Sequence, residues 1–133
     1  MNTEAEKRSL LLEMITFATV DGHLHKRELD FLRLVALELS IGEAEFQDLF
    51  HQETKALPIK SELQRINQFY RLALLMHCDG VLHEKEFQTI QQIALEMGLN
   101  LSAVKRVLEM MKKTPNTVLN PIVLLEIFQE QHN

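Results

Sequence analysis

The sequence predicts an all-α protein, and two observations support that fold class. Every long apolar segment repeats its hydrophobic residues with the 3.6-residue period of a helix, not the two-residue period of a strand. The chain also holds only 4 Gly and 3 Pro in 133 residues, fewer turn residues than a β-sandwich or barrel needs. At this length we expect a single domain of about seven helices.

An internal repeat organises the chain. Asp21-Gly22 recurs as Asp79-Gly80, an offset of 58 residues (79 − 21), and eight of the 24 positions from 21 to 44 are identical at that offset. The identical pairs are Asp21/Asp79, Gly22/Gly80, Leu24/Leu82, His25/His83, Glu28/Glu86, Ala36/Ala94, Leu37/Leu95 and Glu38/Glu96. We therefore expect two halves, about 4–56 and 61–113, related by a pseudo-twofold axis.

Each half is predicted to form three helices. They span about 4–20, 26–39 and 43–55 in the first half, and about 61–78, 84–97 and 102–113 in the second. Apolar residues at helical spacing support each helix, as in Leu11, Met14, Ile15 and Ala18, then Leu32, Val35 and Ala36, then Phe46, Leu49 and Phe50. The breaks are Asp21-Gly22, Ser40-Ile41-Gly42 and, between the halves, Leu57-Pro58.

A last helix, about 121–131, has no counterpart in the repeat. Asn120 suits its N-cap and Pro121 its first position. Its strongly apolar composition leads us to expect that it packs across both halves.

Charge and composition exclude several classes of protein. The net charge is −5, and the excess of acidic residues lies in residues 1–57, which hold eleven acidic and six basic side chains. A net acidic chain without Trp is a poor binder of nucleic acid. No segment is long and apolar enough for a transmembrane helix. The polar N-terminal residues lack the apolar core of a signal peptide, so we expect a cytoplasmic protein.

The repeated motif is Asp-Gly-x-Leu-His-x-x-Glu, at 21–28 and at 79–86. It matches the second half of an EF-hand calcium loop, in which Asp and Glu are ligands. The first two ligand positions of such a loop hold Phe17 and Thr19 in one copy, and Leu75 and His77 in the other. A true EF-hand is therefore excluded.

Two such loops facing each other would bring together Asp21, Glu28, Asp79 and Glu86, with His25 and His83 as two further candidate ligands. Four adjacent carboxylates repel each other, and a divalent metal ion would relieve that repulsion. Carboxylates suit Ca²⁺ or Mg²⁺, whereas histidine ligands shift the preference toward Zn²⁺ or a transition metal.

A purely structural interpretation stands beside the metal site. Glu28 and Glu86 follow His25 and His83 by three residues, which is the spacing of a helix capping box. Gly22 and Gly80 can adopt a positive φ where one helix ends, and Asp21 and Asp79 can each hydrogen-bond within their own turn. All of these features make a stable helix–turn–helix without any metal.

The motif and the helix after it resemble the TerB-like tellurite-resistance family, over roughly residues 10–112. Related domains occur at the N-terminus of DjlA-type membrane co-chaperones. The resemblance implies a seven-helix fold with pseudo-twofold halves, metal binding by Asp21, Glu28, Asp79 and Glu86, and a role in stress-response complexes. The family commonly has Ala before Asp-Gly, where this chain has Val20 and Cys78.

The remaining features favour binding over catalysis. No nucleophile–His pair and no phosphate-binding glycine loop is recognisable, so we expect no enzymatic activity and no catalytic residue. Cys78 aligns with Val20 and is expected to be a packed thiol. Lys105, Arg106, Lys112 and Lys113 make the third helix of the second half basic; such a face is usually only solvated, and the alternative is that it docks an acidic partner. The predicted function is a metal-binding TerB-like module, and the alternative is a metal-free interaction scaffold; a homodimer is compatible with either.

Overall fold

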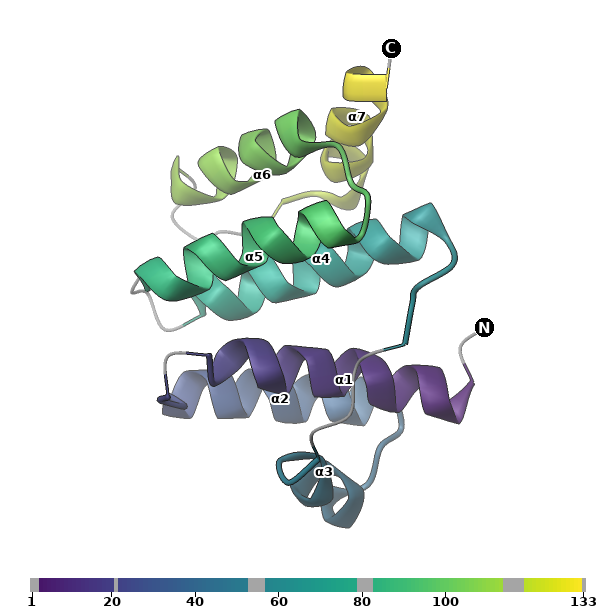
Figure 1. Cartoon of the computed structure of the whole chain (residues 1–133), viewed down its shortest axis with the longest axis vertical. Helices are drawn as coiled ribbons and strands as arrows, with labels where there is room; N and C mark the ends of the chain where they lie inside the picture. The colour runs from purple at the N-terminus through teal and green to yellow at the C-terminus, as the bar shows by residue number, and fades with distance from the viewer. Residues whose placement is uncertain (1–2, 21, 53–56, 79–82, 114–118, 133) are drawn as a thin grey trace.

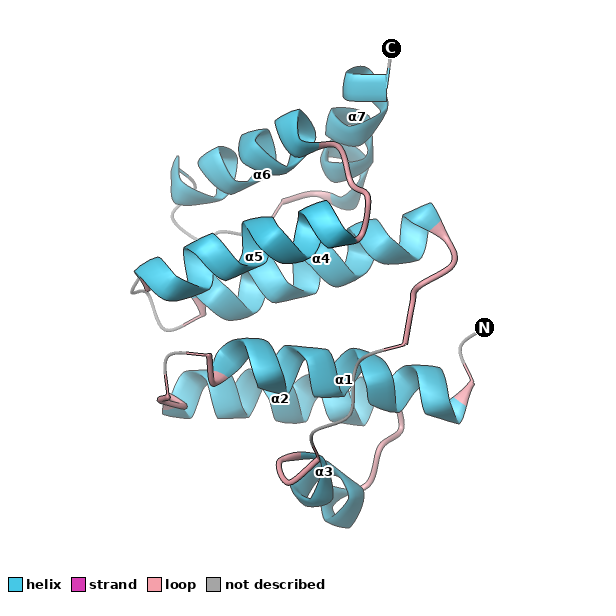
Figure 2. Ribbon diagram, viewed as in Figure 1, coloured by secondary structure: helices cyan, strands magenta, loops and turns pink. Residues whose placement is uncertain are grey.

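Seven helices make up the secondary structure that the computed structural model shows over residues 3–20, 22–52, 57–78, 83–113 and 119–132 (Figure 1). They are α1 (Glu4–Ala18), α2 (Lys26–Glu38), α3 (Glu43–Leu49), α4 (Glu62–His77), α5 (Glu84–Glu96), α6 (Leu101–Lys113) and α7 (Pro121–His132). No strand occurs in these residue ranges, as the ribbon coloured by secondary structure shows (Figure 2). The predicted all-α class is confirmed.

The helices are stacked in layers around one core. α1 packs against α2, α3, α4 and α5, and α4 packs against α1, α2 and α5. α1 and α4 therefore form the centre of the molecule, and α5 also packs against α6. In Figure 1, α1 and α2 form the lower layer with α3 beneath them, α4 and α5 form the middle layer, and α6 with α7 forms the upper one. Leu11, Leu32, Leu72 and Ile90, from four different helices, are wholly buried in a single hydrophobic cluster.

Local signals in the sequence explain most helix boundaries. Thr3 caps α1 in a capping box with Glu6, whose carboxylate accepts a hydrogen bond from Thr3 N at 3.1 Å. The hydroxyl of Ser61 accepts from Gln64 N at 3.4 Å, and the amide oxygen of Asn120 accepts from Ile122 N at 2.8 Å. Each bond satisfies a backbone N–H that has no partner within its own helix.

The third helix is shorter than predicted. The sequence predicts a helix to about residue 55, but α3 ends at Leu49 and continues only as tight turns. Its last amides bond three residues back, from Phe50 N to Gln47 O at 3.3 Å and from His51 N to Asp48 O at 3.0 Å. Only Phe46 and Leu49 of this helix are buried, so little packing favours a longer one.

The last helix occupies a different place from the one expected. α7 packs chiefly against α6, and Phe128 meets Phe69 of α4 edge to face, with ring centroids 6.2 Å apart. The helix therefore extends the core of the second half and does not bridge the two halves. Its apolar residues Leu124, Ile127 and Phe128 are buried in that position.

Candidate functional site

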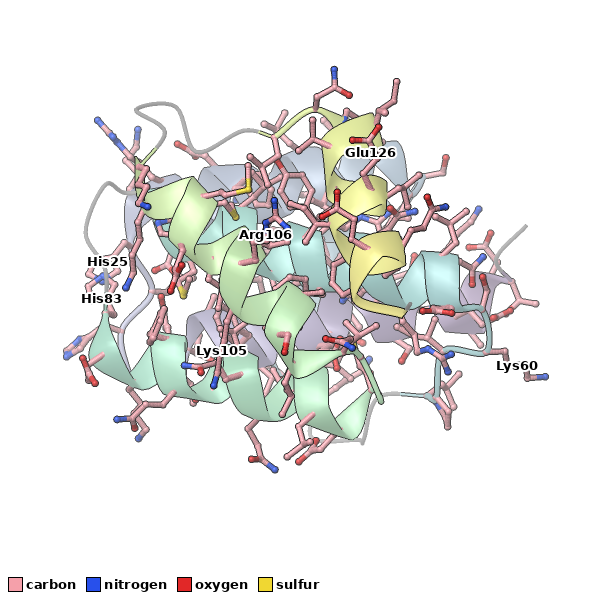
Figure 3. The ribbon with its side chains drawn as sticks, turned by 90° about the horizontal axis from the view of Figure 1, so that it is seen from above. His25, Lys60, His83, Lys105, Arg106 and Glu126 are labelled. Atoms are coloured by element: carbon pink, nitrogen blue, oxygen red, sulfur yellow. The ribbon has the colours of Figure 1, made fainter. Side chains whose placement is uncertain are left out.

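The two copies of the repeated motif meet at their histidines. The imidazole rings of His25 and His83 stack with centroids 4.8 Å apart and an angle of 12° between their planes. Figure 3 shows the two side chains together at one end of the molecule. Residues 58 positions apart in the sequence thus stand face to face, at the starts of α2 and α5.

Both histidines are the N-cap residues of their helices. His25 has φ −83° and ψ 153°, and His83 has φ −90° and ψ 123°. Each histidine is therefore in an extended conformation, directly before the first turn of its helix. Their carbonyls accept the first helical hydrogen bonds, from Leu29 N and Phe87 N, both at 3.0 Å. The positive ends of the two helix dipoles consequently lie near one another at this end of the molecule.

The glutamates of the motif lie in the first turns of these helices and are buried. Glu28 is 1% exposed and Glu86 is 0% exposed. The Glu28 carboxylate accepts a hydrogen bond from His25 N at 3.1 Å, which confirms the capping geometry that the spacing predicts. A buried carboxylate is costly unless hydrogen bonds, helix dipoles or a cation compensate its charge, and the helix N-terminus compensates part of it here.

The loop before α2 contains the glycine that the turn requires. Gly22 has φ +83°, as predicted, and its N–H donates to the carbonyl of Thr19 at 2.9 Å. Nothing lies within 4 Å of a Cβ placed on Gly22, so a side chain here would be disfavoured by backbone strain alone. The corresponding prediction for Gly80 falls outside the described residues, as do the predicted positions of Asp21 and Asp79.

The described part of the chain does not by itself make a metal centre. Within it, no group of three or more His, Cys, Asp or Glu side chains is placed to hold an ion. Of the six predicted ligands, the structure describes His25, Glu28, His83 and Glu86. The other two predicted ligands, Asp21 and Asp79, lie outside the described residues.

The stacked rings limit what the histidines can bind. The lone pair of an imidazole nitrogen lies in the plane of its ring, and two nearly parallel planes do not meet at a common point. An ion held by both histidines would require the rings to tilt toward each other. The carboxylates are thus better suited as ligands than the histidines, and oxygen ligands are those that Ca²⁺ and Mg²⁺ prefer.

The half-buried Cys78 forms the C-terminal cap of α4 and packs against the core, as predicted for a thiol in an apolar position. One buried polar residue was not predicted. Gln68 is 0% exposed, and its amide donates to Leu10 O and to the Glu13 carboxylate, each at 3.0 Å, across the contact between α4 and α1. Its place within the apolar segment of α4 was the available signal.

No helix in the described part of the chain is sufficiently long and apolar to cross a membrane.

The comparisons with known proteins agree with the motif. Residues 1–51 match the family model described as tellurite resistance protein TerB. No curated protein and no solved structure matches the chain. The match includes α1, the first Asp-Gly loop and α2 with its cap His25 and buried Glu28. The resemblance to the TerB family that the motif predicts is confirmed over residues 1–51 of the 133.

Proposed function

We propose that this chain is a non-enzymatic TerB-like domain that binds a divalent cation between its two Asp-Gly loops. One observation supports the proposal above all. The two motifs meet through the His25–His83 stack, and both of their glutamates are buried close to helix N-termini. In this proposal Glu28, Glu86, Asp21 and Asp79 supply oxygen ligands, and the histidine pair holds the two loops in register.

The ligand chemistry favours a hard cation. Four carboxylates offer oxygen ligands only, which suits Ca²⁺, Mg²⁺ or Mn²⁺ more than Zn²⁺. The family match supports placing the module in a system of the tellurite-resistance or stress-response kind. Within such a system we propose a cytoplasmic protein whose cation-bound form presents its helical surfaces to protein partners.

Thermal melts of chelator-treated protein with Ca²⁺, Mg²⁺, Mn²⁺ and Zn²⁺ test this function. A cation that binds only the folded chain stabilises it by about 2.7 kcal/mol at a hundredfold excess over Kd. We expect Asp21→Asn with Asp79→Asn to abolish that gain. The same double variant should leave the metal-free protein as stable as the parent or more stable, because repulsion between carboxylates is relieved.

A matched control removes two carboxylates elsewhere. Asp48 on α3 and Glu126 on α7 are exposed, and Figure 3 shows Glu126 far from the histidine pair. Asp48→Asn with Glu126→Gln should keep the full cation-dependent gain. If no cation shifts the melting temperature of the parent, the loops serve only as caps, and the metal-free scaffold becomes the better description. A shift that survives in the loop variant would place the ion elsewhere.

A further inference from the structure

Two leucines on the outer face of α2 are exposed to solvent. Leu34 is 64% exposed and Leu37 is 73% exposed. Together with Asp30 and Glu38 they follow the spacing i, i+4, i+7 and i+8, so all four lie on one stripe of the helix. The stripe is apolar at its centre and carries a carboxylate at each end. We call it the α2 stripe.

A groove of about 340 Å³ runs between α5 and α6. Its apolar lining is Leu95, Leu101 and Val104, and three glutamines of α5 with Lys105 of α6 complete it. Leu95 is 52% exposed and Leu101 is 40% exposed, so the groove presents apolar surface that nothing in the described part of this chain covers. Leu95 and Leu101 therefore lie beside a concave surface where a side chain of another protein can cover them.

The charges of the groove and the stripe are opposite. Lys105 is exposed and forms no ion pair with any described residue within 4 Å, and Figure 3 shows it projecting from α6. Its neighbours on α6 are engaged, because Arg106 pairs with Glu130 at 2.8 Å and Lys112 lies 4.3 Å from the ring centroid of Phe87. Lys105 is therefore the cation available at the rim.

The end of the α2 stripe that would match Lys105 is its C-terminal end. The last turn of α2 has Glu38 and no basic residue, and the C-terminus of a helix carries a partial negative charge. At the other end, Asp30 pairs with Lys26 at 3.9 Å, so its charge is already partly balanced. Glu38 lies near Arg71 of α4 but remains exposed.

We propose that the α2 stripe of one copy of this chain docks into the α5–α6 groove of a second copy, with Leu34 and Leu37 against Leu95 and Leu101 and with Glu38 near Lys105. This inference is independent of the metal site. α2 belongs to the lower layer in Figure 1 and α6 to the upper one. One copy can consequently use both surfaces at once, and copies add in a head-to-tail series instead of closing as a symmetric pair.

The contact is small, and so the association is weak. Four side chains on one helix face bury far less than the roughly 800 Å² per partner of a stable complex. We expect a Kd on the order of 100 µM. Sedimentation equilibrium of the full chain, from about 10 µM to about 1 mM, should show an average mass that rises with concentration. Added salt should weaken the rise, because it screens the Glu38–Lys105 attraction.

Variants of the two surfaces test the head-to-tail geometry. Leu34→Asp with Leu37→Asp destroys the stripe but leaves the groove, and Leu101→Glu with Lys105→Glu destroys the groove but leaves the stripe. Each variant alone should stay at the mass of one copy. Mixed in equal amounts, they should form a complex of two copies and no larger species, because each supplies the surface that the other lacks.

The control is Ile122→Asp, which changes an equally exposed apolar residue, 65% exposed, on α7; it should associate like the parent. Circular dichroism and melting temperatures establish that all variants are folded, and Lys105→Glu alone serves if the double groove variant is not. Three results would overturn the proposal. They are a parent that stays monomeric up to the highest concentration, mixed variants that do not associate, or a control that loses association. The first would leave the groove to a different protein.

Discussion

The third helices of the two halves differ more than the repeated sequence suggests. α2 and α5 both have 13 residues and start at a histidine cap, whereas α3 has 7 residues and α6 has 13. α3 packs on α1, while α6 packs on α5 and is covered by α7. Two buried side chains hold α3, and five hold α6. Similar sequence around a loop thus fixes the pair of helices that flank it but not the helix that follows.

The C-terminal ends of α2 and α5 also differ between the two halves, in the identity of a single residue. Ser40 has φ +60° and Gly98, 58 positions later, has φ +77°. The next amide bonds five residues back in both places, from Ile41 N to Ala36 O at 2.8 Å and from Leu99 N to Ala94 O at 3.1 Å. Both are Schellman-type ends, but the first has a residue with a Cβ where glycine is preferred.

The contact between α1 and α4 also sets unlike residues against each other. Leu10 and Gln68 are separated by the repeat offset (68 − 10 = 58), and the amide of Gln68 donates to Leu10 O. Gln68 also bonds the Glu13 carboxylate, and its own oxygen accepts from Arg71 at 3.3 Å. The second half thus has a buried polar residue where the first half has an apolar one.

Replacing that polar residue should have the largest effect. Gln68→Leu gives the second half the residue found in the first, but it leaves the half-buried Glu13 carboxylate without its amide donor. We expect the free energy of unfolding to fall by about 2 kcal/mol in urea denaturation. Gln64→Leu, one turn earlier on the same helix, should change it by less than about 0.5 kcal/mol. A Gln68→Leu variant more stable than the parent would show that apolar packing outweighs this network.

Substitutions at the ends of α5 and α2 should have smaller effects on stability, and the two effects should have opposite signs. Gly98→Ala should destabilise the protein by about 1–2 kcal/mol, since a Cβ is disfavoured at positive φ and no other atom lies close enough to add a clash. Ser40→Gly should stabilise the protein, because glycine adopts a positive φ without strain. The gain should stay below about 1 kcal/mol, because glycine loses more conformational entropy on folding than serine does. Thermal melts of both variants measure the difference. Equal and negligible shifts would mean that the two ends tolerate a Cβ alike.

Glu13 gives the smallest expected effect, which depends on pH. Burial raises the pKa of Glu13 above its ordinary value of 4.5, the Gln68 amide opposes that rise, and the charge of Glu96 adds to it. The folded carboxyl therefore holds its proton more tightly than the unfolded one. Its contribution to stability is full below the unfolded pKa and is lost as the pH rises through the folded pKa.

Glu13→Gln removes this titration and keeps an oxygen that can accept from Gln68. Relative to the parent, we expect the variant to gain less than about 1 kcal/mol between pH 4 and pH 7. Urea denaturation of both proteins across that range measures the gain. The comparison between variants matters here, because other groups change the stability of both proteins equally. A constant difference across the range would mean that Glu13 titrates alike in both states.

The sequence predicted the helices well because their apolar periods and caps are local signals. Six of the seven predicted spans agree with the structure to within about two residues, including the start of α7 at Pro121. The length of α3 and the place of α7 depend on which side chains they meet in space, which no local pattern encodes. For the same reason the sequence indicated the paired loops but could not show that His25 and His83 stack. The helical period also left Leu34 and Leu37 off the predicted apolar face of the helix at 26–39, and both are exposed.

The hydrogen-bonded network from Glu13 through Gln68 to Arg71 also affects which helices can pack against each other. If α1 met a second α1 in place of α4, Glu13 would lie near another Glu13 and would lose its amide donor. If α4 packed against a second α4, the Arg71 side chains of the two helices would approach each other. Either exchange places like charges together in a poorly hydrated contact. The polar network that interrupts the resemblance between the halves therefore disfavours the pairing of like helices and favours the contact of α1 with α4.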